Sequence, residues 1–181
     1  MELGKNKQYR ANTFCARWQV VEVAWGWCGL QRGEAGLTRV SLPSPRRADA
    51  VQAVSAGAEE AESDPLLAGA AALLTAYFSG ERIAFDLPLE LRGVGAFGLD
   101  VLRACAAIPW GSTRTYGGLA ARVGSPGAAR AVGQALGRNP LPVLIPCHRV
   151  IGADGRLVGF GSGLPLKRRL LEHEGICGVV P

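Results

Sequence analysis

The spacing of apolar residues changes along this chain, and this change most constrains its fold. Segments 19–25 and 37–42 are rich in β-branched and aromatic residues, as strands are, and the Gly-containing stretch 33–36 between them predicts a turn. Further along, apolar residues recur at helical spacing in segments 66–77 and 99–108. Strand segments followed by helical ones indicate an α+β fold.

The first half of the chain predicts one helix after its strands. Asp64 is expected to cap this helix, with Pro65 in its first turn, and Gly80 is expected to end it. Residues 83–85 predict one more short strand. Residues 44–63 begin with Pro and Arg and continue with small and acidic residues, so we expect a mobile, partly helical loop there.

Two short helices are predicted around a glycine in the second half. The first covers 115–123, with Thr115 as its cap, and Gly124 ends it. Ser125 is then expected to cap a second helix that covers 127–138, with a proline directly after the cap. The pair is either a helix-turn-helix unit or a plain helical hairpin.

The second helix of this pair carries small side chains, with Arg130 as the one long basic residue in its first turns. Helices that read the major groove of DNA carry long polar side chains instead. A helix of small residues either approaches a minor groove closely or packs tightly against another helix, and its sequence alone favours the second reading.

Positive charge gathers in the second half of the chain. Residues 101–181 hold ten Lys and Arg against three Asp and Glu, and the whole chain has a net charge of +5. Of the 20 basic residues, 17 are Arg, whose guanidinium pairs with phosphate in a fork. This bias is consistent with nucleic-acid binding, and a solvated basic face is the alternative.

Composition excludes several classes of protein. The chain is 48% apolar and 19% charged, which is ordinary for a globular protein. The longest apolar run, 66–78, is shorter than a membrane span, and residues 1–14 lack the apolar stretch of a secretory signal. Five cysteines without a CxxC pair predict free thiols in a reducing compartment, hence a cytoplasmic protein. The only histidines are His148 and His173, with no close cysteine pair, so we expect no metal.

Cys147 is the candidate nucleophile of the chain. A reactive cysteine must be a thiolate, which needs a base or a positive neighbour, and His148 and Arg149 follow it directly. Pro146 favours a bent backbone that could bring the thiol and the imidazole to a shared water. A third group should orient the imidazole, and Glu174 is our choice. The alternative is a buried structural cysteine beside a surface histidine.

The chain resembles the O6-alkylguanine-DNA alkyltransferase family, also called methylated-DNA–protein-cysteine methyltransferases. The similarity covers about residues 94–176, continues more weakly through 17–43, and is absent from 1–14 and 45–63. The stretches that carry it are Pro146-Cys147-His148-Arg149-Val150, Arg130-Ala131-Val132-Gly133, Asn139-Pro140, Tyr116-Gly117-Gly118-Leu119-Ala120 and Lys167-Arg168-Arg169-Leu170-Leu171-Glu172-His173-Glu174-Gly175.

The resemblance implies a fold and a reaction. The expected fold is a small ribonuclease-H-like α+β domain over 1–93, followed by a mostly helical, winged-helix-like domain with a helix-turn-helix over 94–181. The expected reaction is direct-reversal DNA repair, in which an alkyl group moves once and irreversibly from O6-alkylguanine in double-stranded DNA to the protein. The expected protein is a monomer without cofactor or metal, and O4-alkylthymine is a possible further substrate.

The resemblance also assigns roles to residues of the site. Cys147 would accept the alkyl group, His148 would take its proton through a water, and Glu174 would polarise His148. Asn139 would brace the turn that carries Cys147, and Tyr116 would help rotate the nucleotide and protonate guanine N3. The residues expected to contact DNA are Arg130, which would fill the space of the extruded base, together with Tyr116, Ser125, Ala129 and Gly133. The residues expected to line the substrate pocket are Val150, Phe160, Gly161 and Ser162.

Gly161 departs from the family pattern, because some members have a serine there whose hydroxyl contacts O6; Ser162 is a possible substitute. Two other functions compete with alkyl transfer. A lesion-binding protein or helix-turn-helix regulator would share the DNA-binding half but would need no thiolate, and the Cys147, His148 and Glu174 set argues against it. A thiol hydrolase would turn over esters or peptides and would not need Arg130.

Overall fold

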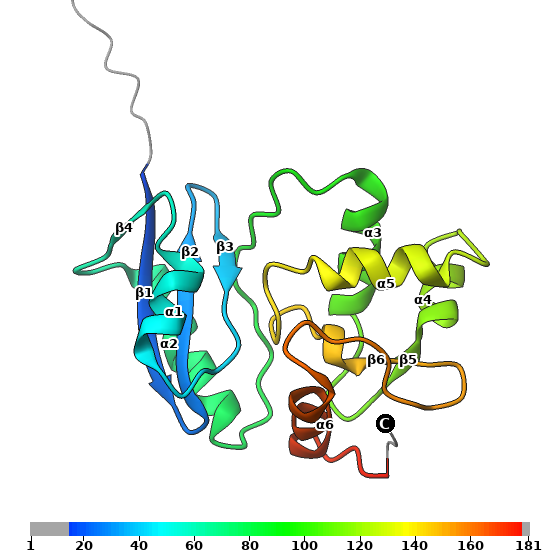
Figure 1. Ribbon diagram of the computed structural model, residues 1–181. Coiled ribbons are helices and arrows are strands. Elements are labelled where there is room, and N and C mark those ends of the chain that lie inside the picture. Colours follow the sequence, from blue (N-terminus) through cyan, green and yellow to red (C-terminus); the bar gives the residue numbers. More distant parts are fainter. Residues whose placement is uncertain (1–14, 179–181) are drawn as a thin grey trace, which may run out of the picture.

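The computed structural model describes residues 15–178, and Figure 1 shows a sheet domain beside a helical domain. The sheet domain contains β1 (Ala16–Val23), β2 (Gly26–Arg32), β3 (Leu37–Val40), α1 (Arg47–Val54), β4 (Ala58–Glu60) and α2 (Pro65–Phe78). The helical domain contains α3 (Ala96–Ala106), β5 (Arg114–Thr115), α4 (Tyr116–Arg122), α5 (Ala129–Gly137), the 3-10 turn η1 (Cys147–Arg149), β6 (Val150–Ile151) and α6 (Leu164–His173). The prediction that residues 1–14 form no secretory signal concerns residues outside the described part.

The first domain is built on a four-stranded sheet in the order β3-β2-β1-β4. β2 pairs antiparallel with both β1 and β3, and β4 lies parallel to β1. The predicted turn at 33–36 is present, with Gly33 N donating to Gly36 O at 2.9 Å. β1 and β3 match the strand segments predicted at 19–25 and 37–42, and β2 lies between them.

The segment 44–63 is not the loop that its composition predicts, because it forms α1 and β4. Ala50 and Val54 of α1 are buried against the sheet. Gly29 of β2 permits this approach, since a Cβ at that position would lie 2.5 Å from Ala50 O. The helical part of the expectation holds, and the strand is a correction.

Helix α2 begins as predicted and the strand expected after it is absent. Asp64 Oδ1 accepts from Leu66 N and Leu67 N at 3.0 and 3.1 Å, which confirms the cap. Gly80 follows the helix with φ of 102°, a left-handed conformation that glycine adopts easily. Residues 83–85 form no strand; their apolar side chains pack against the core from an extended connection between the domains.

Helices α4 and α5 form the predicted pair. Thr115 Oγ1 accepts from Gly118 N at 3.0 Å, which confirms the first cap. The second cap is wrong, because α5 begins at Ala129 rather than after Ser125. Ser125 O accepts from Ala128 N in a turn, and Gly127, with φ of 91°, breaks the helical path in between.

The two domains share one apolar core. Buried leucines of both belong to a single cluster, including Leu30 and Leu74 from the first domain and Leu102 and Leu170 from the second. A backbone bond from Val40 N to Pro140 O, 2.9 Å long, also joins them. The domain boundary at 93/94 stays a prediction. Within residues 15–178, no helix has the length and apolar character to cross a membrane.

Candidate active site

A cavity of about 1030 Å³ lies where the two domains meet, and most of the predicted site residues line it. The predicted residues on its wall are Tyr116, Ala129, Arg130, Gly133, Asn139, Cys147, Phe160, Gly161 and Ser162. Val150 is fully buried in β6 and Ser125 lies in the turn before α5; neither lines the cavity. The first domain adds Arg39, Val40, Leu42 and Ala53, which the sequence did not suggest.

Asn139 braces the turn that leads to the thiol. Its Nδ2 donates to Ile145 O at 2.8 Å, and its Oδ1 accepts from Leu141 N at 3.0 Å. Between these contacts Val143 has φ of 74°, an unfavourable conformation for a β-branched residue. Local strain of this kind persists only where surrounding contacts hold it, and Asn139 supplies two of them. The turn delivers Cys147 to the start of η1.

The thiol of Cys147 is buried and protonated at rest. Cys147 is 8% exposed, and burial raises the pKa of its thiol above the usual range. The side chain of Asn139 and the positive charge of Lys167 oppose this rise in pKa. Because the thiol does not ionise by itself near neutral pH, its reaction as a nucleophile requires a base at the moment of attack.

His148 follows Cys147 in η1 and is paired with a carboxylate. Its Nε2 lies 2.8 Å from Glu174 Oε1, and both residues are almost fully buried. Burial lowers the pKa of His148, so the ring is neutral and can accept a proton. A carboxylate can only accept, so Nε2 carries the ring proton and Nδ1 is the basic nitrogen. Among the described residues, His148 Nδ1 is the one buried side-chain nitrogen or oxygen without a hydrogen-bond partner.

Glu174 is held by three donors, two of which sequence reasoning missed. Arg149 donates from Nε to Oε2 at 2.7 Å and from a terminal nitrogen to Oε1 at 2.9 Å. Tyr77 Oη donates to Oε1 at 2.8 Å. Burial acts to raise the pKa of Glu174, but the hydrogen bonds from His148 and Arg149 outweigh it and hold this pKa at about 2. The carboxylate is therefore ionised throughout the neutral range.

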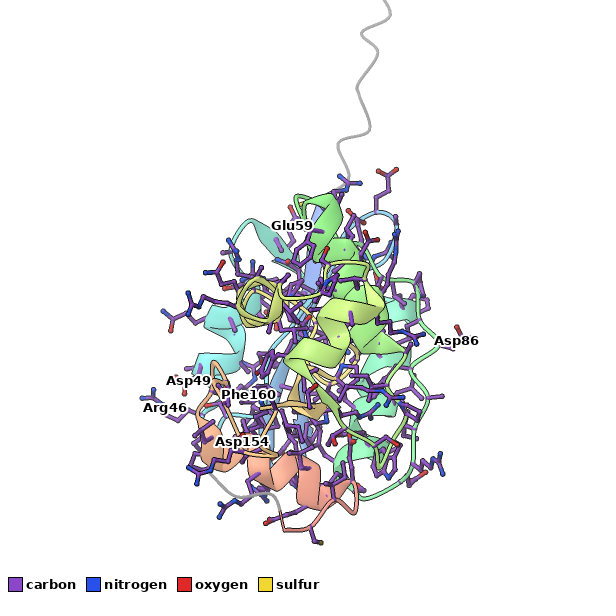
Figure 2. The ribbon with its side chains drawn as sticks, turned by 90° about the vertical axis from the view of Figure 1, so that its right-hand side faces the viewer. Arg46, Asp49, Glu59, Asp86, Asp154 and Phe160 are labelled. Atoms are coloured by element: carbon purple, nitrogen blue, oxygen red, sulfur yellow. The ribbon has the colours of Figure 1, made fainter. Side chains whose placement is uncertain are left out.

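Tyr116 is tied to the loop that closes the other side of the cavity. Its Oη donates to Val158 O at 3.0 Å, and Lys167 Nζ donates both to Tyr116 Oη at 3.3 Å and to Val158 O at 2.9 Å. Burial raises the pKa of Tyr116 to about 12 and lowers that of Lys167 to about 8. Phe160, labelled in Figure 2, comes from the same loop, between β6 and α6.

Helix α5 packs against its neighbours and also lines the cavity. Val132 and Leu136 are buried against the helices around α5. Ala129, Arg130, Gly133 and Leu136 line the cavity, and a Cβ at Gly133 would lie 3.7 Å from the Tyr116 ring. Arg130 is exposed at the mouth, and none of the hydrogen bonds or ion pairs found within residues 15–178 involves it.

The contacts of three buried polar residues at the site were not predicted from the sequence. Arg149 follows Cys147 and suggested a positive neighbour for the thiol, yet its guanidinium binds Glu174 and Ile108 O. Lys167 and Tyr77 are fully buried polar residues; Tyr77 lies on the helix predicted after Asp64, and Lys167 lies on α6, which was not predicted from the sequence. A lysine on the buried face of a helix is the one feature that could have been noticed beforehand.

The residues described here hold no group of three or more His, Cys, Asp or Glu side chains placed to bind a metal ion. The expectation that the protein works without a metal stays a prediction. What the fold and site define is a two-domain protein with a buried thiol, a histidine base and a carboxylate beside a cavity.

Comparison with known proteins identifies the class. Residues 96–176 match the family model described as 6-O-methylguanine DNA methyltransferase, DNA binding domain, and residues 17–91 match its ribonuclease-like domain. A methylated-DNA–protein-cysteine methyltransferase from Mycolicibacterium paratuberculosis is 52% identical over 113 residues, which is 62% of this chain and 68% of the relative. One from Methanosarcina acetivorans is 47% identical over 116 residues, 64% of this chain and 74% of the relative.

Solved structures agree with this result. The Mycobacterium tuberculosis O6-methylguanine methyltransferase superposes with a TM-score of 0.71 at 38% identity, covering 88% of this chain and 92% of that one. A structure of Mycobacterium tuberculosis OGT in complex with DNA gives a TM-score of 0.72 at 39% identity, with 88% and 93% covered. The chain belongs to the methylated-DNA–protein-cysteine methyltransferase family. The predicted α+β fold, with a ribonuclease-like first domain and a DNA-binding second domain, is confirmed.

Proposed function

We propose that this chain repairs DNA by moving an alkyl group from O6 of guanine to the sulfur of Cys147. The observation that carries the proposal is the hydrogen bonding of the His148 ring: Nε2 is bound to an ionised Glu174, while Nδ1 is buried and has no partner among the described residues. A histidine held in this way is a base ready to take one proton. Family membership and the DNA-bound relative support the choice of DNA as partner.

The reaction begins with removal of the thiol proton. His148 Nδ1 takes it through a water, because the side chains of consecutive residues point apart and a water bridges such distances. Glu174 stabilises the imidazolium that forms, as a buried carboxylate does for a catalytic histidine. Because burial raises the pKa of the Cys147 thiol, the thiolate forms only together with this imidazolium.

The thiolate then displaces guanine from the alkyl carbon. The new bond is S–C, the bond that breaks is C–O6, and the electron pair of that bond stays on the base. Tyr116 gives a proton to guanine N3 as this charge develops, and its raised pKa keeps it protonated until then. A thioether has no easy way back to a thiol, so each chain reacts once.

The cavity wall suits a base that has left the duplex. O6 of a stacked guanine is out of reach, so the nucleotide must be turned out at a cost of a few kcal/mol. The small residues of α5 suit a close approach to the minor groove, and Arg130, which is exposed and lines the cavity, would occupy the gap. Phe160, Gly161 and Ser162 form the wall that faces the extruded base.

The proposal also covers the compartment, oligomeric state, DNA partner and cofactor requirement of the protein. We expect a cytoplasmic monomer that binds double-stranded DNA containing O6-alkylguanine, with no cofactor.

Intact-protein mass spectrometry after incubation with a duplex bearing one O6-methylguanine tests the function. The expected result is a gain of one methyl group per chain, saturating at one and mapping to Cys147. Unmodified duplex gives no gain. A Cys147→Ala variant gives none either, yet still binds the duplex.

Cys105→Ala is the matched control, because Cys105 is another buried thiol of the second domain that does not line the cavity. This variant keeps full transfer. A wild-type protein that binds the lesion tightly without gaining mass would instead be a lesion-recognition protein. Repeated turnover of an ester substrate would make it a thiol hydrolase.

A further inference from the structure

Tyr77 belongs to the first domain, but its hydroxyl reaches the carboxylate of the active site in the second. The side chain is fully buried near the end of α2, and Oη donates to Glu174 Oε1 at 2.8 Å. The two residues are 97 positions apart in the chain. The bond is thus a direct connection between the ribonuclease-like domain and the histidine–carboxylate pair.

Tyr77 and His148 share one acceptor atom. Glu174 Oε1 receives Tyr77 Oη, His148 Nε2 and a terminal nitrogen of Arg149 within 2.9 Å, whereas Oε2 receives only Arg149 Nε. Donors that converge on one oxygen divide its negative charge among them. The hydroxyl of Tyr77 therefore sets how strongly Glu174 attracts the proton of His148, without contacting His148 through a hydrogen bond of its own.

The ring of Tyr77 is fixed by aromatic neighbours from both domains. Its centroid lies 5.0 Å from that of Phe78, 5.2 Å from His173, 5.4 Å from Trp110 and 5.8 Å from Phe85. His173 Nε2 also lies 2.6 Å from Tyr77 O. The hydroxyl consequently cannot swing away from Glu174 without repacking this cluster, and a phenylalanine at position 77 would keep the same ring contacts.

We propose that Tyr77 is a positioning residue for alkyl transfer: its hydroxyl fixes the Glu174 carboxylate and moderates its charge, so that His148 keeps its proton on Nε2 and offers Nδ1 as the base. The inference rests on the proposed function. It gives the first domain a part in the chemistry beyond its contribution to the cavity wall.

The charged and titratable groups around this pair come from three elements. Tyr77 is on α2, His148 and Arg149 are on η1, and α6 brings His173 and Lys167. Burial and the charge of Glu174 raise the pKa of Tyr77, so its hydroxyl stays a donor throughout the neutral range. Arg149 and Lys167 both act to lower the pKa of His148, against the attraction of Glu174.

The test replaces Tyr77 by phenylalanine and observes His148 itself. The chain has only two histidines, so NMR of the imidazole nitrogens resolves both, and a His148→Gln variant assigns them. With one donor removed, Glu174 attracts the imidazolium more strongly, and the pKa of His148 rises by about half a unit or more in Tyr77→Phe. The acid limb of the pH profile for transfer from free O6-benzylguanine moves to higher pH by the same amount, and the rate at neutral pH falls about three- to tenfold because the freed carboxylate no longer holds the His148 ring in place.

A control separates this role from simple packing. Leu74→Val alters a fully buried apolar residue on the same helix, three positions before Tyr77, and removes no hydrogen-bonding group. It lowers thermal stability but leaves the pH profile and the His148 titration unchanged. A Tyr77→Phe protein with wild-type values for both, whatever its melting temperature, overturns the inference. If the wild-type protein transfers nothing, the proposed function fails, whereas the His148 titration still decides whether Tyr77 controls this ring.

Discussion

Lys167 Nζ donates a hydrogen bond to Tyr116 Oη at 3.3 Å, and the lysine is fully buried. The same ammonium donates to Val158 O, which also accepts from Tyr116. Lys167 therefore holds together the proton donor of the proposed reaction and the loop that faces the base. Burial lowers its pKa to about 8, so its charge is lost just above neutral pH.

Replacement of Lys167 by methionine tests this relationship. Methionine keeps most of the apolar stem and removes every donor, so transfer from free O6-benzylguanine is expected to slow about tenfold or more. The wild-type rate falls above about pH 8, because a neutral amine no longer stabilises the negative charge that develops on Tyr116, and the variant lacks this limb. Arg168→Met, next on the same helix, serves as the control. An unaltered pH–rate profile in Lys167→Met would contradict the interpretation.

Arg130 is the residue whose effect depends on the form of the substrate. It stands exposed at the cavity mouth, so Arg130→Ala does not disturb the core. Only a duplex requires extrusion of the base, and the variant is expected to repair O6-methylguanine in duplex DNA about tenfold more slowly or worse. Reaction with the free base stays near the wild-type rate. Single-turnover rates on both substrates measure the difference, and equal losses would refute an extrusion role.

Replacing Asn139 tests the turn that leads to Cys147. Asn139→Ala removes the bonds to Ile145 O and Leu141 N and is expected to cost about 1–3 kcal/mol of unfolding free energy. Transfer slows as well, because the strained turn no longer holds Cys147 at the cavity.

Gln31→Ala is a matched control for Asn139→Ala. It removes a similar hydrogen bond from a side-chain amide in the first domain, in which Gln31 Nε2 donates to Val54 O at 2.8 Å. Urea denaturation should show losses of the same order in both variants. Only the Asn139 variant should lose activity, and an equal loss of activity in both would mean that general destabilisation explains it.

Local signals in the sequence predicted the local structure well. Asp64 and Thr115 are caps because a short polar side chain before a helical segment satisfies free backbone N–H groups whatever the rest of the chain does. The grouping of Cys147, His148 and Glu174 came from a basic, thiol-bearing segment and a resemblance. In the structure His148 Nε2 and Glu174 Oε1 lie 2.8 Å apart, and the roles of the three residues stay a prediction.

The features that sequence reasoning missed depend on contacts between distant residues. Tyr77 meets Glu174 across 97 positions, and no periodicity in α2 marks that face as different from ordinary core. Helix α1 lies where Gly29 of another element leaves room for it, and its own sequence is only weakly amphipathic. The start of α5 was misplaced because Ser125 and a proline form a good cap signal, while Gly127 adopts a left-handed conformation that overrides it.

The buried pair of His148 and Glu174 also links stability to pH. Burial lowers the pKa of His148 below 6.5, so the unfolded chain binds a proton there that the folded protein excludes. Glu174, with its pKa held at about 2 against an ordinary 4.5, contributes stability above pH 4.5 that is lost as the pH falls toward 2. In both cases the unfolded state binds more protons, and stability therefore rises with pH across each window.

The free energy of unfolding is accordingly expected to fall between pH 7 and pH 5, where protonation of His148 dominates, and to fall further below pH 4.5, where Glu174 also takes up a proton. Urea denaturation at fixed ionic strength measures it at each pH. His148→Gln removes the titrating ring, so the stability of this variant changes much less between pH 7 and pH 5, whereas Glu174, still bound by Arg149, gives a smaller loss below pH 4.5. A His148→Gln protein as pH-sensitive as the wild type in the upper window would show that other groups, not the buried imidazole, account for that slope.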